Sequence, residues 1–532
     1  MIKGSELSFF KSKQNKIQKI VNNSNVEISI YKTNLESLYS IAEKSATQYS
    51  DKTFVLDQEW DISFKEFLAL VDKYADYLKV VHSIDEHDRV GMLLLNSLEF
   101  CVSLIAINKI GACAVILPTK QKEDMLDVLL QAANADLVLV DNFFSKEHEE
   151  NIFVKYNYEI CDFNNREYYN LISETRTANY PTLKKGNDAV LLFTSGTTGN
   201  SKQVALTNFN LVQAILEYSY SLDLSSKDKT IIATPMYYVT GLIGLFGLFL
   251  NIGGTIFIHK FFNVVEVLNC IKENGITFMH SSPTVYNLML SQKEQYKELN
   301  SIRILLSGSS AMPIEKIMEM NEWLPNVDLR TVYGLTETSS PLTLMPFSNV
   351  DSEHIASVGI PFTTAQIRIT NDKGYDIGFG EIGEIEARGA TIIEQYKIPQ
   401  PDLFREGSWL RTGDVGYISE DNFLYIVDRK KDIINSGGEK VSSVHIENLL
   451  YKFKDIAEVA VVGIKDPLYG EKVAAMVVLK PNKRLTEEEI VKEMKKKVPK
   501  YQIPKKIEFV SDIPKNSNLK VDKKRVKELL SN

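Results

Sequence analysis

The chain has 532 residues, of which 44% are hydrophobic and 24% charged, a composition typical of a globular protein. This length exceeds what one hydrophobic core usually supports, so two to four structural units are expected. The net charge of −8 argues against nucleic acid as a general partner, because phosphate backbones are bound by concentrated basic surfaces.

The cysteines and the first residues indicate a protein of the cytoplasm. Cys101, Cys113, Cys161 and Cys270 are scattered and lack the spacing of metal ligands, so we expect reduced thiols in the core. No basic segment followed by an apolar one opens the chain, as a secretory signal would require. Residues 1–33 are polar and carry no motif, and we expect an N-terminal extension that either docks on the body or stays mobile.

Helix-like and strand-like segments alternate from residue 34 onward. A strand at 88–95, a helix from Ser97 to Ile110 that stops at Gly111, and a strand from Cys113 to Leu117 form one crossover unit. The same alternation recurs up to about residue 323. The sequence therefore predicts the α/β class, with a large domain over 34–429 built on parallel sheets.

The stretch from Leu191 to Val204 (LLFTSGTTGNSKQV) is the strongest local signal. An apolar run gives way to small and hydroxyl residues and then to Lys202. Such residues let the backbone approach an anion, while hydroxyl and amide groups donate to it and the lysine adds a charge, so polyphosphate is the expected ligand. A flexible surface loop is the alternative. A strand signal precedes the stretch and a helix-like segment, 206–220, follows it, which is the context that favours a phosphate loop.

An apolar run from Val239 to Ile258 is about long enough to span a bilayer. Asn251, Gly253 and Gly254 divide it into a helix-like half and a β-branched half. We therefore expect a buried helix followed by a core strand, and no membrane span.

The sequence changes in character near residue 359. Short strands and turns follow, including Thr370 to Gly374, whose Asn, Asp and Gly residues predict a hairpin. We expect a small β-rich subdomain over about 359–429. A new alternation of helices and strands then predicts a separate, small C-terminal α+β domain over 430–532.

Six stretches resemble, in order, the motifs of the adenylate-forming superfamily, which comprises acyl- and aryl-CoA synthetases, carrier-loading adenylation enzymes and luciferases. They are the loop after Phe193, Thr331–Thr338 (TVYGLTET), Gly383–Ile385 with Arg388–Gly389, Trp409–Asp414 (WLRTGD), Asp428–Val441 (DRKKDIINSGGEKV) and Ile513–Val521 (IPKNSNLKV). The resemblance covers roughly residues 34–532, and the chain is most similar to an AMP-forming acyl-CoA synthetase.

The resemblance implies ATP, Mg²⁺ and a pantetheine thiol as cofactors, and it implies roles for individual residues. Lys520, Thr336 and Glu337 occupy the catalytic positions, with Glu337 as the metal ligand. Lys431 occupies the position of the hinge about which the small domain turns. The nucleotide-binding positions are Thr194, Ser195, Gly196, Thr197, Thr198, Gly199, Lys202, Ser309, Tyr333, Asp414 and Arg429. The thiol would reach the site along Gly437 and Gly438, since glycines allow a narrow tunnel.

The acid pocket is expected to have small and aromatic walls. Its candidate residues are Tyr237, Tyr238, Thr240, Ser282, Ser307, Gly308 and Val332. The region 235–241 lacks the aspartate with which amino-acid-activating relatives hold the substrate ammonium group. The expected substrate is therefore an aryl or medium-chain carboxylic acid without an α-amino group.

Several positions depart from the family pattern. Ser201 and Gln203 stand where proline and glycine are usual, Tyr238 stands where many relatives have histidine, and Leu519 replaces the glycine before the catalytic lysine. If position 519 needs a positive φ, a non-glycine residue costs about 1–2 kcal/mol. We interpret these changes as compatible with an active, slower enzyme.

The expected reaction is ATP-dependent activation of a carboxylic acid to an acyl-adenylate with release of pyrophosphate, followed by transfer to coenzyme A. A stand-alone enzyme that transfers the acyl group to a carrier-protein phosphopantetheine is the nearest alternative, with the acyl carrier protein as a partner. A non-catalytic nucleotide-binding scaffold is the remote alternative, motivated by Ser201, Gln203 and Leu519.

Overall fold

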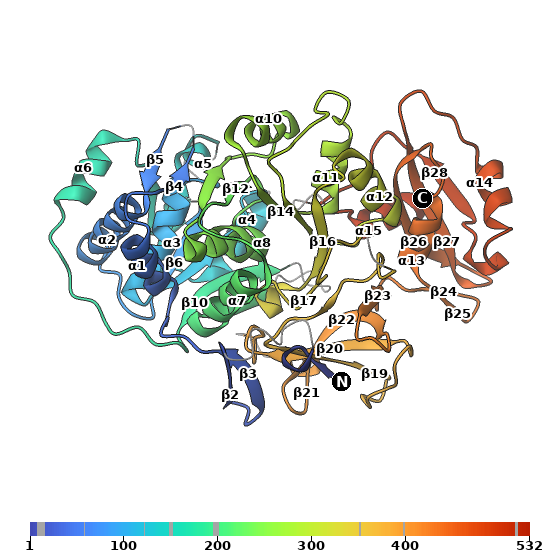
Figure 1. The fold of residues 1–532 in the computed structure, drawn as a ribbon, viewed down its shortest axis with the longest axis horizontal. Helices are drawn as coiled ribbons and strands as arrows, with labels where there is room; N and C mark the ends of the chain where they lie inside the picture. The colour runs from blue at the N-terminus through green and yellow to red at the C-terminus, as the bar shows by residue number, and fades with distance from the viewer. Residues whose placement is uncertain are drawn as a thin grey trace.

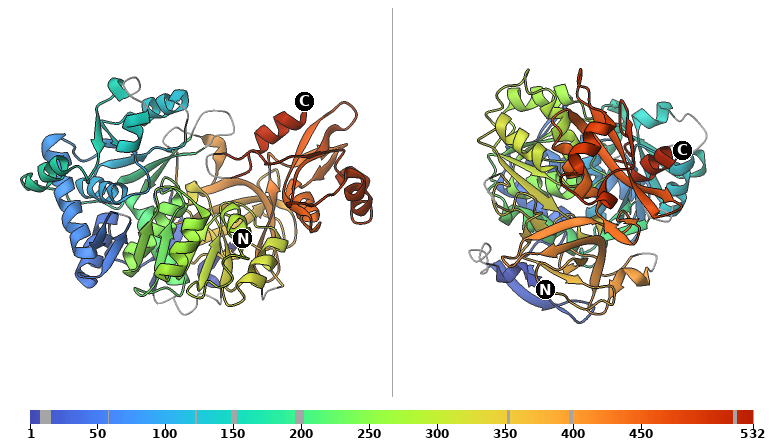
Figure 2. Two further views of the ribbon diagram at one scale, coloured as in Figure 1. Left: turned by 90° about the horizontal axis from the view of Figure 1, so that it is seen from above. Right: turned by 90° about the vertical axis from the view of Figure 1, so that its right-hand side faces the viewer.

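The computed structural model describes residues 1–7, 16–57, 59–121, 123–147, 153–194, 202–350, 353–396, 400–516 and 520–531. A large α/β body carries a β-rich unit along one side and a small α+β unit at one end (Figure 1). Figure 2 shows the same arrangement from above and from the end, with the small unit projecting from the body. The predicted α/β class with parallel sheets is confirmed.

The larger sheet of the body has nine strands, and the strands from β16 to β4 in its order are parallel. The short strands at its two edges pair in antiparallel fashion. In spatial order the strands are β18 (Ile360–Pro361), β17 (Thr343–Leu344), β16 (Asp328–Tyr333), β15 (Ile304–Ser307), β14 (Phe278–Ser281), β12 (Lys229–Ile232), β13 (Thr255–Ile258), β4 (Thr53–Leu56) and β5 (Asp61–Ser63).

The second sheet of the body has six strands, of which five are parallel. In spatial order they are β11 (Lys202–Thr207), β10 (Asp188–Thr194), β7 (Cys113–Ile116), β6 (Arg89–Leu93), β8 (Leu137–Asp141) and β9 (Tyr158–Cys161). Apolar runs such as 113–117 are buried on both faces, as parallel sheets require.

Helices cover and separate these sheets. α3 begins after the N-cap Ser97 and ends at Gly111, which adopts φ 88° as a left-handed cap, so the predicted start and stop signals are confirmed. Almost every side chain of α3 is buried, because the helix is apolar on all sides. The helices of the body are α1 (Leu38–Gln48), α2 (Phe64–Val81), α3 (Leu98–Ile110), α4 (Glu123–Ala133), α5 (Asn142–Glu147), α6 (Arg166–Glu174), α7 (Asn208–Ser221), α8 (Val239–Gly241), α9 (Leu248–Ile252), α10 (Val264–Asn274), α11 (Pro283–Leu290) and α12 (Ile314–Trp323).

The apolar run at 239–258 folds as a buried helical segment followed by a strand, as predicted. Its helical half is α8, a π-helical stretch at Leu242–Gly247 and α9, and Gly253 ends it with φ 75°. β13 forms the other half inside the nine-stranded sheet. Among the described residues, no helix is long and apolar enough to cross a membrane. The four cysteines are buried free thiols.

The β-rich unit is an antiparallel sheet to which the start of the chain contributes a strand. Its strands are β1 (Ile2–Lys3), β19 (Ala365–Thr370), β20 (Gly383–Gly389), β22 (Trp409–Ile418) and β21 (Phe404–Arg405), with β23 (Leu424–Arg429) on β22. In the turn after β19, the Asn371 side chain accepts from two backbone N–H groups, those of Lys373 and Tyr375. Asn371 thereby provides the turn chemistry expected from the sequence.

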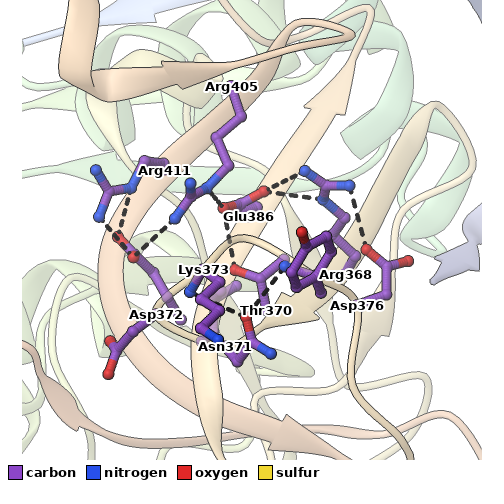
Figure 3. A network of polar contacts seen from close by, with 12 residues as sticks. Arg368, Thr370, Asn371, Asp372, Lys373, Asp376, Glu386, Arg405 and Arg411 are labelled. Atoms are coloured by element: carbon purple, nitrogen blue, oxygen red, sulfur yellow. Dashed lines mark hydrogen bonds and ion pairs between the residues drawn. The ribbon is translucent and has the colours of Figure 1, made fainter.

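A network of ion pairs stiffens this unit (Figure 3). Glu386, whose side chain is fully buried, forms ion pairs with Arg368, at 2.7 Å, and with Arg405. It also accepts a hydrogen bond from the Thr370 hydroxyl. Glu384, two residues earlier on β20, forms ion pairs with Arg411 at 2.7 Å and with Lys430 at 3.1 Å. The network therefore reaches the residue that directly precedes the predicted hinge at Lys431.

The described part of the N-terminal extension is docked on the body. β2 (Ile17–Val21) and β3 (Glu27–Tyr31) form a hairpin, and Tyr31 is fully buried against α7. Tyr31 donates its hydroxyl to Glu217 of α7 at 2.9 Å. Between docking and mobility, the structure therefore supports docking.

The small C-terminal unit is built on a five-stranded sheet covered on both faces. Its strands are β25 (Glu439–Val441), β24 (Ile434–Ser436), β27 (Gly470–Leu479), β26 (Ile456–Asp466) and β28 (Lys506–Phe509). Alternate residues of β26 and β27 pack on α13 (Ser443–Tyr451) and α14 (Glu487–Met494) on one face, and on α15 (Lys523–Ser531) on the other. The unit thus has two small cores of its own.

Candidate active site

The predicted acid-pocket residues lie at the carboxyl ends of neighbouring parallel strands. Ser281 of β14, Ser307 of β15 and Thr331 of β16 stand in register across the sheet. The residues that follow are therefore brought to one edge, where open α/β sheets usually bind ligands. They are Ser282 after β14, Ser307 and Gly308 at the end of β15, Val332 on β16, and Tyr237, Tyr238 and Thr240 after β12.

A histidine that sequence analysis did not single out contributes to this region. His280 of β14 is buried, and burial lowers the pKa of its imidazole to about 3, so the ring is neutral at physiological pH. A Cβ added to Gly244 would lie 2.6 Å from its Nδ1, and one added to Gly308 would lie 3.2 Å from its Nε2. The two glycines therefore make room for the ring. Within the described residues, His280 Nδ1 and Ser307 Oγ are buried without a hydrogen-bond partner.

The phosphate-loop candidate joins two antiparallel strands. Thr194 at the end of β10 pairs with Lys202 at the start of β11. The helix expected over 206–220 begins only at Asn208, after the N-cap Thr207, because residues 202–207 pair with β10 as strand β11. The expected direct passage from loop to helix was therefore wrong. Ser195, Gly196, Thr197, Thr198 and Gly199, together with Ser201, lie outside the described residues.

Three of the predicted nucleotide residues meet although they are far apart in sequence. Tyr333, at the end of β16, donates its hydroxyl to Asp414 Oδ2 at 2.7 Å, and Arg429 Nε lies 3.4 Å from Asp414 Oδ1. Burial raises the pKa of the Asp414 carboxyl, while the Arg429 charge opposes that rise. Arg429 itself is half-exposed and can reach a ligand beside the buried carboxylate. Ser309, after β15, is exposed with φ 72°.

Glu337 lies in a short 3₁₀ turn, Thr336–Thr338, just after β16. Its Oε1 accepts a hydrogen bond from the Tyr396 hydroxyl at 2.7 Å, and the Lys202 ammonium lies 5.7 Å from the centre of the Tyr396 ring. Tyr396 was not identified from the sequence. The Glu337 carboxylate provides hard oxygen donors, which fit Mg²⁺.

Lys520 comes to the site from the small unit. Its backbone is hydrogen-bonded to Asn516: Asn516 N–H donates to Lys520 O at 2.8 Å, and Lys520 N–H donates to Asn516 Oδ1 at 3.1 Å. Burial, and next the repulsion by Arg429, lower the pKa of the Lys520 ammonium to about 8, while the attraction of Asp414 opposes them. The lysine is therefore within electrostatic reach of the Asp414–Arg429 pair. Leu519 lies outside the described residues.

The predicted hinge and thiol residues lie at the junction with the small unit and on its sheet. Lys431 is exposed, and Asp428 before it accepts from Ser443 N–H at 2.6 Å and from Ser443 Oγ at 2.8 Å. Gly437 and Gly438 form the exposed turn between β24 and β25 with φ 66° and 90°.

Gly334 allows the turn between Tyr333 and Glu337 to close. A Cβ at this position would overlap the Ser340 carbonyl oxygen. We expect Gly334→Ala to lower the free energy of unfolding by about 1–3 kcal/mol, because the backbone must shift, and to weaken ATP binding at least tenfold. Chemical denaturation and ATP titration check this result. Gly186→Ala is the matched control, since a Cβ there meets nothing within 4 Å, and equal behaviour of both variants would contradict the assignment.

In this protein, carboxylates, hydroxyls and cations lie together at the ends of parallel strands. This arrangement is typical of α/β enzymes that bind nucleotides. Residues 42–397 match the family model described as AMP-binding enzyme, and residues 445–520 match the one described as AMP-binding enzyme C-terminal domain. The first match covers more than half of the chain. The chain therefore belongs to the AMP-binding enzyme family.

Individual relatives resemble the chain over nearly its whole length. A 2-succinylbenzoate–CoA ligase of Bacillus velezensis is 30% identical over 472 residues, which cover 88% of this chain and 93% of the relative. The structure of o-succinylbenzoate CoA synthetase from Bacillus subtilis with its acyl-adenylate intermediate has a TM-score of 0.81 at 27% identity and covers 92% of this chain and 97% of that one. The structure of the Bacillus subtilis enzyme with ATP and magnesium ion has a TM-score of 0.80 at 26% identity, with coverages of 92% and 99%.

Proposed function

We propose that the protein is an AMP-forming acid–thiol ligase that activates a carboxylic acid with ATP and transfers the acyl group to coenzyme A. The observation that carries the proposal is the cluster of Tyr333, Asp414 and Arg429, in which the Tyr333 hydroxyl donates to Asp414 at 2.7 Å and Arg429 lies 3.4 Å from the same carboxylate. The charges of Asp414 and Arg429 also act on the pKa of Lys520, which belongs to the small unit. The family and the relatives support the same reaction, since the relatives named above are CoA ligases with acyl-adenylate and ATP complexes.

In the first half-reaction, a carboxylate oxygen of the acid attacks the α-phosphorus of ATP, and the bond from that phosphorus to pyrophosphate breaks. Asp414 would accept hydrogen bonds from the ribose hydroxyls, with Arg429 beside it, while Tyr333 would lie against the adenine. Lys202 and the hydroxyl and amide groups of residues 194–199 would bind the phosphates. Mg²⁺ at Glu337 would neutralise part of the triphosphate charge. Lys520 would bridge the acid carboxylate and the α-phosphate.

In the second half-reaction the small unit would turn about Lys431, withdraw Lys520 and present Gly437 and Gly438 to the thiol. The contact of Asp428 with Ser443 spans this hinge and would be broken or rearranged in the turn. Coenzyme A is the proposed acceptor because the relatives are named as CoA ligases.

The acid is proposed to be an aryl acid that carries a neutral polar group and no α-amino group. The region 235–241 provides no carboxylate for an ammonium group. The neutral His280 and the unpartnered Ser307 hydroxyl can exchange hydrogen bonds with a carbonyl or hydroxyl of the substrate. The relative from Bacillus velezensis is named for 2-succinylbenzoate, which is an aryl acid without an α-amino group.

The test is acid-dependent exchange of labelled pyrophosphate into ATP with Mg²⁺, across aryl, short, medium and long acids and amino acids. Exchange with aryl acids supports the proposal, and exchange with amino acids only contradicts the substrate class. Absence of exchange with every acid contradicts the enzymatic function. Saturable formation of acyl-CoA from free coenzyme A then supports coenzyme A as the acceptor, whereas transfer only to a carrier-protein phosphopantetheine contradicts it.

We expect the first half-reaction to depend on pH through Lys520. The charged ammonium is the active form, and its pKa is about 8 in the free protein. The kcat/KM for ATP should therefore be constant below that pH and fall about tenfold per unit above it. Lys520→Arg should be slower with a flat profile, because a guanidinium stays charged. An identical alkaline fall in Lys520→Arg would assign the titration to another group.

A further inference from the structure

Tyr396 connects two charged parts of the candidate phosphate site and has no role in the reaction as described so far. It lies after β20, and its side chain is 6% exposed. Its hydroxyl donates to Glu337 Oε1 at 2.7 Å, and its ring lies under the Lys202 ammonium at 5.7 Å. Three residues earlier, Ile393 N–H donates to the Glu337 backbone carbonyl at 3.0 Å. The segment 393–396 therefore holds both the backbone and the side chain of Glu337.

Opposite charges in one site create a difficulty before the ligand arrives. At about 4 Å a lysine and a carboxylate attract each other by about 4 kcal/mol at the effective dielectric of a protein surface. A direct pair of Lys202 with Glu337 would thus occupy the two groups that the metal and the phosphates need. Among the residues that the structure describes, these two side chains form no ion pair with each other, and Tyr396 contacts both.

The chemistry of a tyrosine suits this position. The hydroxyl gives the carboxylate a charge-assisted hydrogen bond without cancelling its charge. The face of the ring attracts the ammonium through its quadrupole, again without neutralising it. The contacts occupy one oxygen of Glu337 and leave the second, Oε2, for a metal ion.

We propose that Tyr396 is a positioning residue that keeps Glu337 oriented for Mg²⁺ and keeps Lys202 from pairing with it. The inference rests on the proposed function, in which Glu337 holds the metal and Lys202 the phosphates. Partners of this kind orient metal ligands, and their loss typically lowers metal affinity or activity about 10–100-fold. The alternative is that Tyr396 only fills space, since its ring also packs edge-on against Phe404, with centroids 6.2 Å apart.

The test measures ATP affinity by calorimetric titration with Mg²⁺ and with a chelator in its place. For Tyr396→Phe, which keeps the ring, we expect ATP to bind about tenfold more weakly with Mg²⁺ and within twofold of the wild type without it. For Tyr396→Leu, which also frees Lys202 to pair with Glu337, we expect weaker binding under both conditions. Tyr417→Phe is the control, since Tyr417 stacks on Tyr425 in the β-rich unit, with centroids 4.9 Å apart, and should match the wild type.

A double-mutant cycle separates positioning from packing. Glu337→Gln alone should remove most of the Mg²⁺-dependent gain in ATP affinity, and Tyr396→Phe should then have no further effect. Additive losses, or an equal loss of affinity with and without Mg²⁺ in Tyr396→Phe, would overturn the inference. A wild-type affinity that does not depend on Mg²⁺ would instead contradict the proposed metal site itself, so the two failures are distinguishable.

Discussion

Lys520→Ala is expected to slow formation of the acyl-adenylate by about a hundred- to a thousandfold, the loss seen when comparable transition-state donors are removed. A cation about 4 Å from the reacting phosphate is worth about 4 kcal/mol at an effective dielectric near 20. The pKa of Lys520 is lowered by burial and by the charge of Arg429, and the charge of Asp414 opposes this shift. Pyrophosphate exchange measures the loss.

The same variant should form thioester from preformed acyl-adenylate at nearly the wild-type rate, because Lys520 is withdrawn in that step. Single-turnover transfer to coenzyme A measures it. Lys524→Ala is the matched control, since Lys524 is an exposed lysine four positions away. Equal loss of both half-reactions in Lys520→Ala would contradict the assigned role.

Glu217→Ala is expected to lower the free energy of unfolding by about 3–5 kcal/mol, a large part of the 5–15 kcal/mol typical of a folded protein. Glu217 is fully buried and accepts from Tyr31 at 2.9 Å, from the backbone N–H groups of Thr363 and Thr364 at 3.1 and 3.0 Å, and from the Thr364 hydroxyl at 2.6 Å. The alanine leaves these donors buried without an acceptor.

Urea denaturation measures this loss, with Glu322→Ala as the control. Glu322 is exposed on α12, and its removal should change stability by less than about 0.5 kcal/mol. Glu217→Gln keeps one acceptor oxygen and should fall between the two. A loss in Glu217→Ala no larger than in the control would show that the buried carboxylate does not join the N-terminal hairpin to the body.

Much of the fold could be predicted from the sequence because its signals are local. The cap at Ser97, the stop at Gly111 and the apolar strand after it lie within one crossover unit, and each occurs where expected. β11 was missed because a six-residue segment with only three apolar residues is ambiguous beside a helix until its partner β10 is known. The pairing of β1 with β19 joins residues more than 360 positions apart, and no local pattern indicates it.

The candidate site shows the same division. Tyr333, Asp414 and Arg429 could be named because each stands in a recognisable motif, and the structure brings them together. Tyr396 and His280 could not, since a tyrosine and a histidine outside such motifs look like ordinary core residues. Tyr396 matters because it is hydrogen-bonded to Glu337, 59 positions away. His280 matters because Gly244 and Gly308, on separate elements, leave room for its ring.

The pairing of β1 with β19 affects how the protein folds during its synthesis on the ribosome. Ile2 pairs with Ile367, so an early strand must wait for a partner made more than 360 residues later. At about 5–20 residues per second this delay is about 20–70 s. During that time the two-residue β1 has no partner strand, so the sheet of the β-rich unit can be completed only late in synthesis.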